Sequence, residues 1–162
     1  MNTWLINLLA FAGTYLLMEF VAWSNHKYIM HGPGWILHKS HHEERKGIFE
    51  WNDLYFVFYA AVSMTLVYFG WENLDYRFWM GCGVAAYGLT YFLLHDVFIH
   101  GRAKFLKSLR SDYFDAMRRA HRAHHKTTTK HGAVEFGLLL FNRKWKEIIR
   151  RNKRMKHQVN VR

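Results

Sequence analysis

The sequence predicts an all-α integral membrane protein: a helical bundle with cytoplasmic amphipathic helices that carry a histidine-rich dinuclear metal site. Three observations predict it. Three segments of roughly 20 residues are apolar and nearly uncharged, the last third of the chain is strongly basic, and ten of the twelve histidines fall into one spacing pattern that occurs twice. At 162 residues, the chain has room for a single domain, residues 1–162.

The three apolar segments are interpreted as membrane helices at about residues 4–24, 54–71 and 78–99. The first contains one charged residue, Glu19, and has no cationic start, so we interpret it as a retained membrane helix and not as a signal peptide. Asn52 and Asp53 precede the second segment and are typical of a helix N-cap. The uncharged part of the third segment, residues 78–94, leads directly into His95.

The charge distribution predicts how these helices are oriented. Residues 101–162 contain 18 Lys and Arg and only four Asp and Glu, whereas residues 1–100 contain five and eight. Positive charge favours the cytoplasmic side, so we expect the His-rich regions 25–52 and 100–130 and the basic tail 143–162 to be cytoplasmic. Residues 102–130 are predicted to form amphipathic helix. The apolar run 134–141 is too short to span a bilayer, and is expected to lie in the interface or to re-enter the membrane.

Several classes of function are excluded by composition. The single cysteine, Cys82, rules out a disulfide framework, a thiolate zinc site and an iron–sulfur cluster within one chain. No glycine-rich nucleotide motif is present, so electrons for any redox chemistry must come from a partner. No nucleic-acid motif accompanies the basic charge, and we expect no nucleic-acid partner. An acidic protein and an anionic lipid surface are the partners that fit the charge.

The histidines repeat as HxxxxH followed by HxxHH. Ten residues follow this pattern, namely His26, His31, His38, His41 and His42 in the first copy and His95, His100, His121, His124 and His125 in the second. In an α-helix the three histidines of HxxHH share one face, so each triplet is expected to form half of a metal site. The pair in HxxxxH lies about 140° apart on an α-helix. These two side chains should therefore flank a pair of ions, or the helix should break near the second histidine.

Ten imidazoles suggest two metal ions, and imidazole suits zinc, copper, iron and nickel. Asp96 adjoins His95, and Glu19 lies seven residues before His26 on nearly the same helical face. We expect both carboxylates to tune the ligands through hydrogen bonds without binding metal. His131 and His157 fall outside the pattern and are expected to be ordinary polar residues.

The segment from His26 to Tyr55, HKYIMHGPGWILHKSHHEERKGIFEWNDLY, closely resembles bacterial beta-carotene hydroxylases, which are members of the fatty acid hydroxylase superfamily of membrane di-iron enzymes. The second set of histidines matches the remaining boxes of that family, and the resemblance covers nearly the whole chain. One departure is Phe98, where a smaller residue is expected.

This resemblance implies hydroxylation of ring carbon 3 of beta-ionone rings, from beta-carotene through beta-cryptoxanthin to zeaxanthin, and also from canthaxanthin to astaxanthin. It implies two iron ions, which zinc can replace in purified protein, and dioxygen as co-substrate. It further implies a bacterial inner-membrane location and electrons from ferredoxin and ferredoxin-NAD(P)H reductase. The alternatives are a fatty-acyl or sterol hydroxylase or desaturase with the same metal centre, and a metal transporter.

A basic cytoplasmic surface is expected to attract the acidic ferredoxin, with anionic lipid as the alternative partner. Six residues are assigned to it: Lys104, Lys107, Arg110, Arg118, Arg119 and Arg122.

Overall fold

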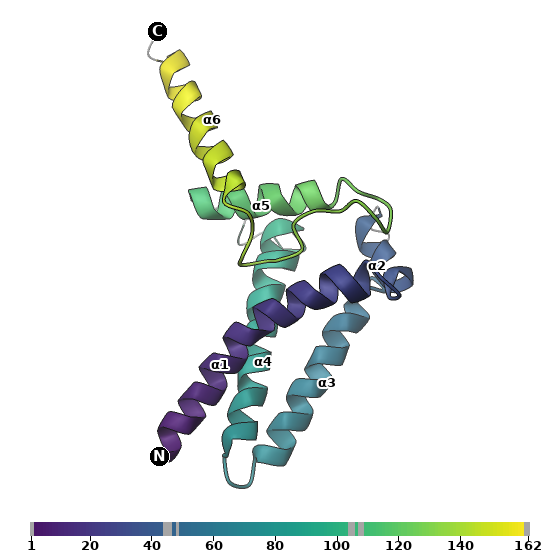
Figure 1. Ribbon diagram of the computed structural model, residues 1–162, viewed down its shortest axis with the longest axis vertical. Helices are drawn as coiled ribbons and strands as arrows, with labels where there is room; N and C mark the ends of the chain where they lie inside the picture. The colour runs from purple at the N-terminus through teal and green to yellow at the C-terminus, as the bar shows by residue number, and fades with distance from the viewer. Residues whose placement is uncertain (1, 44–46, 48, 104–105, 107–108, 161–162) are drawn as a thin grey trace.

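A computed structural model describes residues 2–43, 47, 49–103, 106 and 109–160, and every regular element in these residues is a helix. The bundle consists of three long helices (Figure 1). They are α1 (Thr3–Ser24), which continues as the π-helix η1 (Asn25–Met30), then α3 (Asp53–Gly70), and α4 (Tyr76–Tyr91), which continues as the π-helix η2 (Phe92–Ile99).

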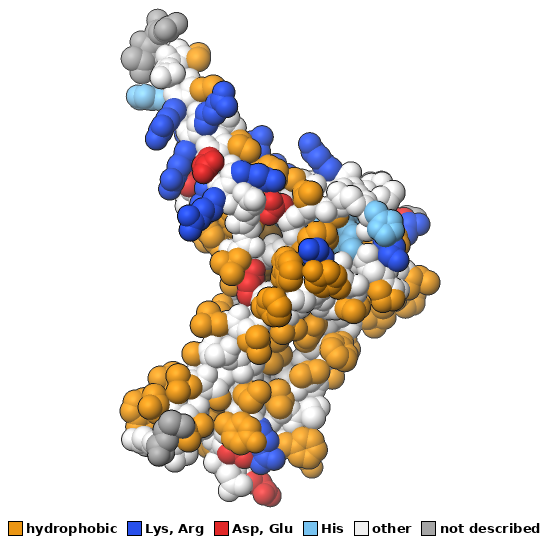
Figure 2. All heavy atoms as spheres, viewed as in Figure 1, with side chains coloured by type: hydrophobic (Ala, Val, Ile, Leu, Met, Phe, Trp, Pro, Cys, Tyr) orange, Lys and Arg blue, Asp and Glu red, His pale blue; other side chains and the backbone are white. Residues whose placement is uncertain are grey.

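All three long helices are apolar and long enough to cross a membrane. Their apolar side chains point mostly outward: Leu16 is 72% exposed and Tyr68 is 78% exposed. Figure 2 shows hydrophobic side chains spread over the surface of this bundle. An outward apolar surface of this extent needs lipid to cover it. The predicted fold class, an all-helical membrane bundle, is therefore confirmed.

Helix α4 is the central helix of the bundle, because α1 and α3 both pack against it and make few contacts with each other. Two glycines allow this close approach. A Cβ on Gly81 would lie 2.8 Å from the carbonyl oxygen of Ser63 on α3, and a Cβ on Gly83 would lie 2.7 Å from that of Phe11 on α1. The Ser63 hydroxyl donates to the Gly81 carbonyl at 2.8 Å, which ties α3 to α4.

Three shorter helices lie at the end of the bundle that carries η1 and η2 (Figure 1). They are α2 (Trp35–His42), α5 (Asp112–His124) and α6 (Lys144–Asn160). The amphipathic helix predicted over 102–130 is shorter than expected, because α5 is the only helix among the residues of this range that the structure describes (102–103, 106 and 109–130). It begins at Ser111, whose hydroxyl accepts the amide N–H of Phe114. The basic tail forms α6, which packs on α5 and projects away from the bundle (Figures 1 and 2).

Residues 126–143, which we call the strap, connect α5 to α6 without regular structure. The strap includes the apolar run 134–141. Leu138 of this run is buried against Phe98 of η2 and Met117 of α5. The strap therefore lies across the end of the bundle, between α1 and α5.

Candidate metal centre

The ten histidines of the repeated pattern converge in one layer, where η1, α2, η2 and α5 meet. They form two groups. In site A, ligand atoms of five histidines lie within 4.8 Å of one another, namely those of His26, His31, His38, His42 and His124. In site B the same holds for His41, His100, His121 and His125. His95 joins site B, because its Nε2 lies 3.2 Å from Nε2 of His41.

Each HxxHH triplet divides between the two sites. The first and last histidines of a triplet serve one site, and the middle histidine serves the other. Thus His41 of the first triplet lies in site B, and His124 of the second lies in site A. The expectation that a triplet forms one half-site is therefore wrong for its middle residue. On an α-helix the first and fifth positions are one turn apart, while the fourth lies to the other side of the first, toward the neighbouring site.

The HxxxxH pairs owe their geometry to the two π-helices. In a π-helix the backbone hydrogen bond joins residues five apart, so such residues stack on one face. The amide N–H of His31 donates to the carbonyl of His26 at 3.0 Å, and that of His100 donates to the carbonyl of His95 at 2.9 Å. Both members of the first pair consequently face site A. They do not flank two ions, which was the first of the two alternatives predicted from the sequence. The second alternative, a helix that ends near the second histidine, is what the structure shows, because η1 ends at Met30 and η2 at Ile99, with His31 and His100 as their C-caps.

Seven of the histidines donate a hydrogen bond from Nδ1 to an acceptor that has no proton to give. The five of site A use neutral acceptors: Phe136 O for His26 (2.8 Å), Lys130 O for His31 (3.1 Å), Asn52 Oδ1 for His38 (2.7 Å), Thr127 O for His42 (2.8 Å) and Val134 O for His124 (2.9 Å). Two of site B use carboxylates: Glu50 for His41 (3.0 Å) and Asp96 for His95 (3.3 Å). These partners assign the proton to Nδ1 and leave a lone pair on Nε2.

The Nε2 lone pairs then face each other at short range. Nε2 of His38 lies 3.1 Å from that of His26 and 3.2 Å from that of His42, and the His31–His124 distance is 3.2 Å. Two lone pairs cannot hydrogen-bond to each other. Nitrogens that bind one ion at about 2.1 Å lie about 3 Å apart when they subtend a right angle. The Nε2 of His125 is also buried without a hydrogen-bond partner among the described residues. The donor set therefore fits a pair of metal ions.

Burial favours the neutral form, which binds metal, in five histidines of the two sites: His38, His41, His42, His121 and His124. Loss of solvation lowers the pKa of His38 to about 3, of His42 to about 4 and of His124 to about 2. The pKa values of His41 and His121 are lowered well below the usual value for the same reason, with neighbouring histidines adding to the effect.

Several residues of this supporting layer were missed from the sequence. Asn52 was expected to cap α3, but its side chain makes no capping bond and instead accepts from His38. Glu50 was assigned no role and accepts from His41. The carbonyl groups of the strap hold four histidines, and a backbone acceptor has no signature in a sequence. Only the proximity of Glu50 and Asn52 to the first HxxHH motif could have indicated them.

Glu19 is placed differently from the expectation. Its carboxylate contacts no histidine of the described chain. Oε1 accepts the amide N–H groups of Leu138, Leu139 and Leu140 at 3.1, 2.8 and 2.9 Å, and Oε2 accepts the hydroxyl of Tyr87 at 2.8 Å. Glu19 thus fixes the strap to α1, and the strap in turn supplies carbonyls to His26 and His124.

An apolar cavity of about 280 Å³ lies below the histidines, between α1, α3 and α4. Its walls are mostly hydrophobic and include Met18, Phe56, Val84 and Gly88. His26, His95 and His121 line it at the end where the two sites meet, together with Arg102. Phe98 faces elsewhere: it packs against Phe114, and the Arg118 guanidinium lies 4.2 Å from its ring centroid. The phenylalanine at position 98, where the family resemblance predicted a smaller residue, therefore does not line the cavity.

The match to known proteins agrees with this arrangement. The family model for fatty acid hydroxylase matches residues 11–148. The chain belongs to the fatty acid hydroxylase family. It is 47% identical over 136 residues to a beta-carotene hydroxylase of Pantoea ananas, covering 84% of this chain and 78% of the relative. It is 42% identical over 135 residues to one of Pseudescherichia vulneris, with 83% and 77% covered. Beta-carotene 3-hydroxylase 2, chloroplastic, of Arabidopsis thaliana is 30% identical over 154 residues, with 88% and 50% covered. No solved structure is significantly similar.

The sequence assigned six residues to a basic surface for an acidic partner. Two of them, Lys104 and Lys107, lie outside the described residues. Arg119 and Arg122 are exposed on α5, and Arg110 is exposed with Asp115 3.9 Å away. Arg118 is partly covered, because it stacks on Phe98.

Proposed function

We propose that this chain is a membrane di-iron monooxygenase that hydroxylates ring carbon 3 of the beta-ionone rings of carotenoids. The products would be beta-cryptoxanthin and then zeaxanthin from beta-carotene, and astaxanthin from canthaxanthin. One observation carries the proposal: two sets of five imidazoles form a pair of adjoining sites directly above an apolar cavity between membrane helices. Relatives that share most of the chain are named beta-carotene hydroxylases.

The ten histidines would hold two iron ions, one in site A and one in site B, through Nε2. When bound, the pair of ions supplies the dioxygen chemistry that places one oxygen atom in a C–H bond and reduces the other to water. The chain's own residues orient the ligands through Nδ1, keep the imidazoles neutral and hold the ring beneath the ions. Zinc, which favours the same ligands, can replace iron in purified protein.

The cavity suits the end ring of a carotenoid and not the whole molecule. At about 280 Å³ it is smaller than most pockets that enclose a drug-sized ligand. Because α1 and α3 make few contacts with each other, the polyene chain would extend between them into lipid while the ring lies against His26, His95 and His121. An apolar substrate would thus enter from the bilayer, which avoids transfer through water.

Two electrons per hydroxylation must come from outside, and we propose ferredoxin with ferredoxin-NAD(P)H reductase as the donor. The basic charge of α5 and α6 would attract an acidic protein. His100 is exposed, so site B extends to the surface on the same side of the bundle. We place this side in the cytoplasm and the protein in the bacterial inner membrane.

Expression of the chain in cells that accumulate beta-carotene tests the proposed function. We expect beta-cryptoxanthin and zeaxanthin to appear in the extracted pigments. The His131→Ala variant, which removes a histidine outside both sites, should give the same products. Absence of hydroxylated carotenoid, with the protein present in the membrane, would contradict the proposal. Hydroxylated fatty acids or sterols in its place would favour the alternative substrates.

Gly88→Leu should obstruct the cavity without disturbing the helix. A Cβ at Gly88 meets nothing closer than 4.0 Å, so the added side chain fits locally and projects into the space for the ring. Displacement of the ring carbon by about 1 Å is enough to lower kcat/KM for beta-carotene by about a hundredfold. The measurement is hydroxylation by membranes of matched protein content.

The matched control is Gly13→Leu, because Gly13 is exposed on α1 with no atom within 4 Å of its added Cβ. Unchanged rates are expected for this variant. Equal rates for Gly88→Leu and the control would show that the ring does not occupy this cavity.

A further inference from the structure

The two metal sites share a repeated ligand pattern but differ in the groups behind the ligands. In site A all five Nδ1 atoms donate to uncharged oxygens, four of which are backbone carbonyls. In site B two Nδ1 atoms donate to carboxylates, from His41 to Glu50 and from His95 to Asp96. The sequence repeat alone would predict equivalent sites, so the asymmetry arises in the supporting residues.

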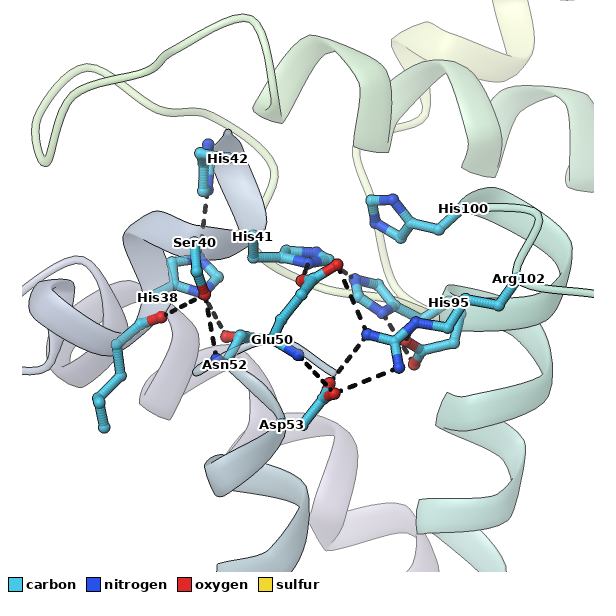
Figure 3. A network of polar contacts seen from close by, with 12 residues as sticks. His38, Ser40, His41, His42, Glu50, Asn52, Asp53, His95, His100 and Arg102 are labelled. Carbon is cyan, nitrogen blue, oxygen red and sulfur yellow. Dashed lines mark hydrogen bonds and ion pairs between the residues drawn. The ribbon is translucent and has the colours of Figure 1, made fainter. Parts of the chain in front are cut away.

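Arg102 contacts both of these carboxylates, those of Glu50 and Asp96. Figure 3 shows its guanidinium between His95, Glu50 and Asp53. Its Nε lies 3.0 Å from Asp96 Oδ1, and its Nη2 lies 3.7 Å from Glu50 Oε1. The same Nη2 lies 2.9 Å from Asp53 Oδ1 at the start of α3. The Arg102 side chain is only 17% exposed, so water weakens these contacts less than on an open surface.

The backbone directs Arg102 toward this position. Gly101 follows His100 with a φ of +69°, a left-handed conformation that glycine adopts without strain. The chain turns back there, and the Arg102 amide N–H donates to the Asp96 carbonyl at 2.9 Å. The guanidinium is thereby held between η2 and α3, where its planar set of donors can contact three carboxylates at once.

The local charge balance favours the ion of site B. Among the described residues, three carboxylates contact one guanidinium in a largely buried network beside this site, and two of these carboxylates also accept from its histidines. A carboxylate on the outer nitrogen of a ligating histidine makes the imidazole a stronger donor, and loss of such a partner typically costs about 10–100-fold in metal affinity. The neutral oxygens of site A provide no comparable charge.

We propose that Arg102 is a positioning residue that fixes Glu50 and Asp96 on His41 and His95, and that the ion of site B is consequently held more tightly than the ion of site A. The inference rests on the ligand assignment made under the proposed function. It extends that assignment by ranking the two sites and by naming the residue responsible for the difference.

Metal release from purified, zinc-loaded protein tests this ranking. With a chromophoric chelator, wild-type protein should release one zinc ion per chain quickly and one slowly. His124→Ala should remove the quick phase, and His125→Ala should remove the slow phase, which assigns the phases to sites A and B. In Arg102→Gln the slow phase should accelerate by about 10–100-fold while the quick phase stays unchanged.

Two further variants make the result specific. Arg77→Gln breaks an arginine–aspartate pair with Asp75 at the opposite end of the bundle, so both phases should match wild type. Arg102→Lys keeps the charge but cannot reach all three carboxylates, and an intermediate release rate is expected. If Arg102→Gln does not fold, as judged by helical circular dichroism and gel filtration, Arg102→Lys provides the comparison.

The proposal is overturned if wild-type protein releases both ions at one rate, or if neither Arg102 variant changes the slow phase. Wild-type protein that binds fewer than two ions would also overturn it, together with the ligand assignment. The expression experiment of the proposed function measures zeaxanthin, and its result does not depend on which of the two ions is released first. A failure of that assay is therefore distinguishable from a failure of this ranking.

Discussion

Replacement of both His121 and His124 with alanine should remove both metal ions from the protein, although the two residues belong to one HxxHH motif. His121 lies in site B and His124 lies in site A, so the double variant removes a ligand from each site. Each change also leaves a buried void among ligands that can no longer close around an ion. Bound metal should fall from about two ions per chain to nearly none, and hydroxylation of beta-carotene should become undetectable.

The decisive comparison is the His38→Ala, His124→Ala double variant. These residues come from different motifs in different halves of the chain, yet both lie in site A. This variant should keep about one ion per chain, as each single variant should, and it too should be inactive if both ions are needed. His131→Ala should keep both ions. Metal analysis that found one ion in the first double variant and none in the second would show that each motif serves its own ion.

The fold and the clustering of the ten histidines were predictable because both leave a periodic trace in the sequence. A membrane helix needs an unbroken apolar run, and the runs around Leu16 and Tyr68 are long enough to be recognised. The histidine pattern is repeated in order and spacing, which chance does not readily produce. Both signals depend only on the order of residues along one helix.

The pairing of ligands was not predictable by the same means. The angle of about 140° between His26 and His31 was calculated for an α-helix, but this segment is a π-helix. In a π-helix the hydrogen bond joins residues five apart, so the two side chains lie on the same face. The same holds for His95 and His100 in η2. The division of each triplet between two sites depends on where a second helix lies. Four acceptors of site A are backbone carbonyls of the strap, which any residue could supply. Such contacts become visible only once the chain is folded.

The strap depends on a single buried carboxylate. Glu19 is 7% exposed and accepts four hydrogen bonds, three of them from consecutive amide groups, Leu138 to Leu140. Three amide groups can converge on one oxygen only in a tight turn, and a Cβ on Gly137 would collide with the Leu140 carbonyl in this turn. Two residues before Leu138, the carbonyl of Phe136 accepts from His26. The charge on α1 is therefore coupled to the metal centre through the backbone.

Glu19→Ala should release the strap and empty site A while site B keeps its ion. The change leaves three amide groups without their acceptor, and that of Leu138 is buried while those of Leu139 and Leu140 are partly buried. A buried donor that loses its acceptor costs about 1–3 kcal/mol, and the partly buried ones cost less because water can reach them, but the sum is still large compared with the stability of an irregular segment. We expect about one ion per chain, loss of hydroxylation, and faster hydrogen exchange of the amides of residues 138–140. Glu19→Gln retains an oxygen that can accept the same three groups, so its effect should be smaller.

Tyr87→Phe serves as the matched control for the carboxylate itself, because it removes one donor to Glu19 and leaves the strap contacts intact. This variant should keep both ions, and the amide hydrogens of residues 138–140 should exchange as slowly as in the wild-type protein. If Glu19→Ala behaved like Tyr87→Phe in metal content and exchange, the strap would be held by its apolar contacts with Phe98 and Met117 and not by the carboxylate. A membrane helix rarely carries a buried acid without a use for it, and here the amide contacts identify that use as support for the ligands of site A.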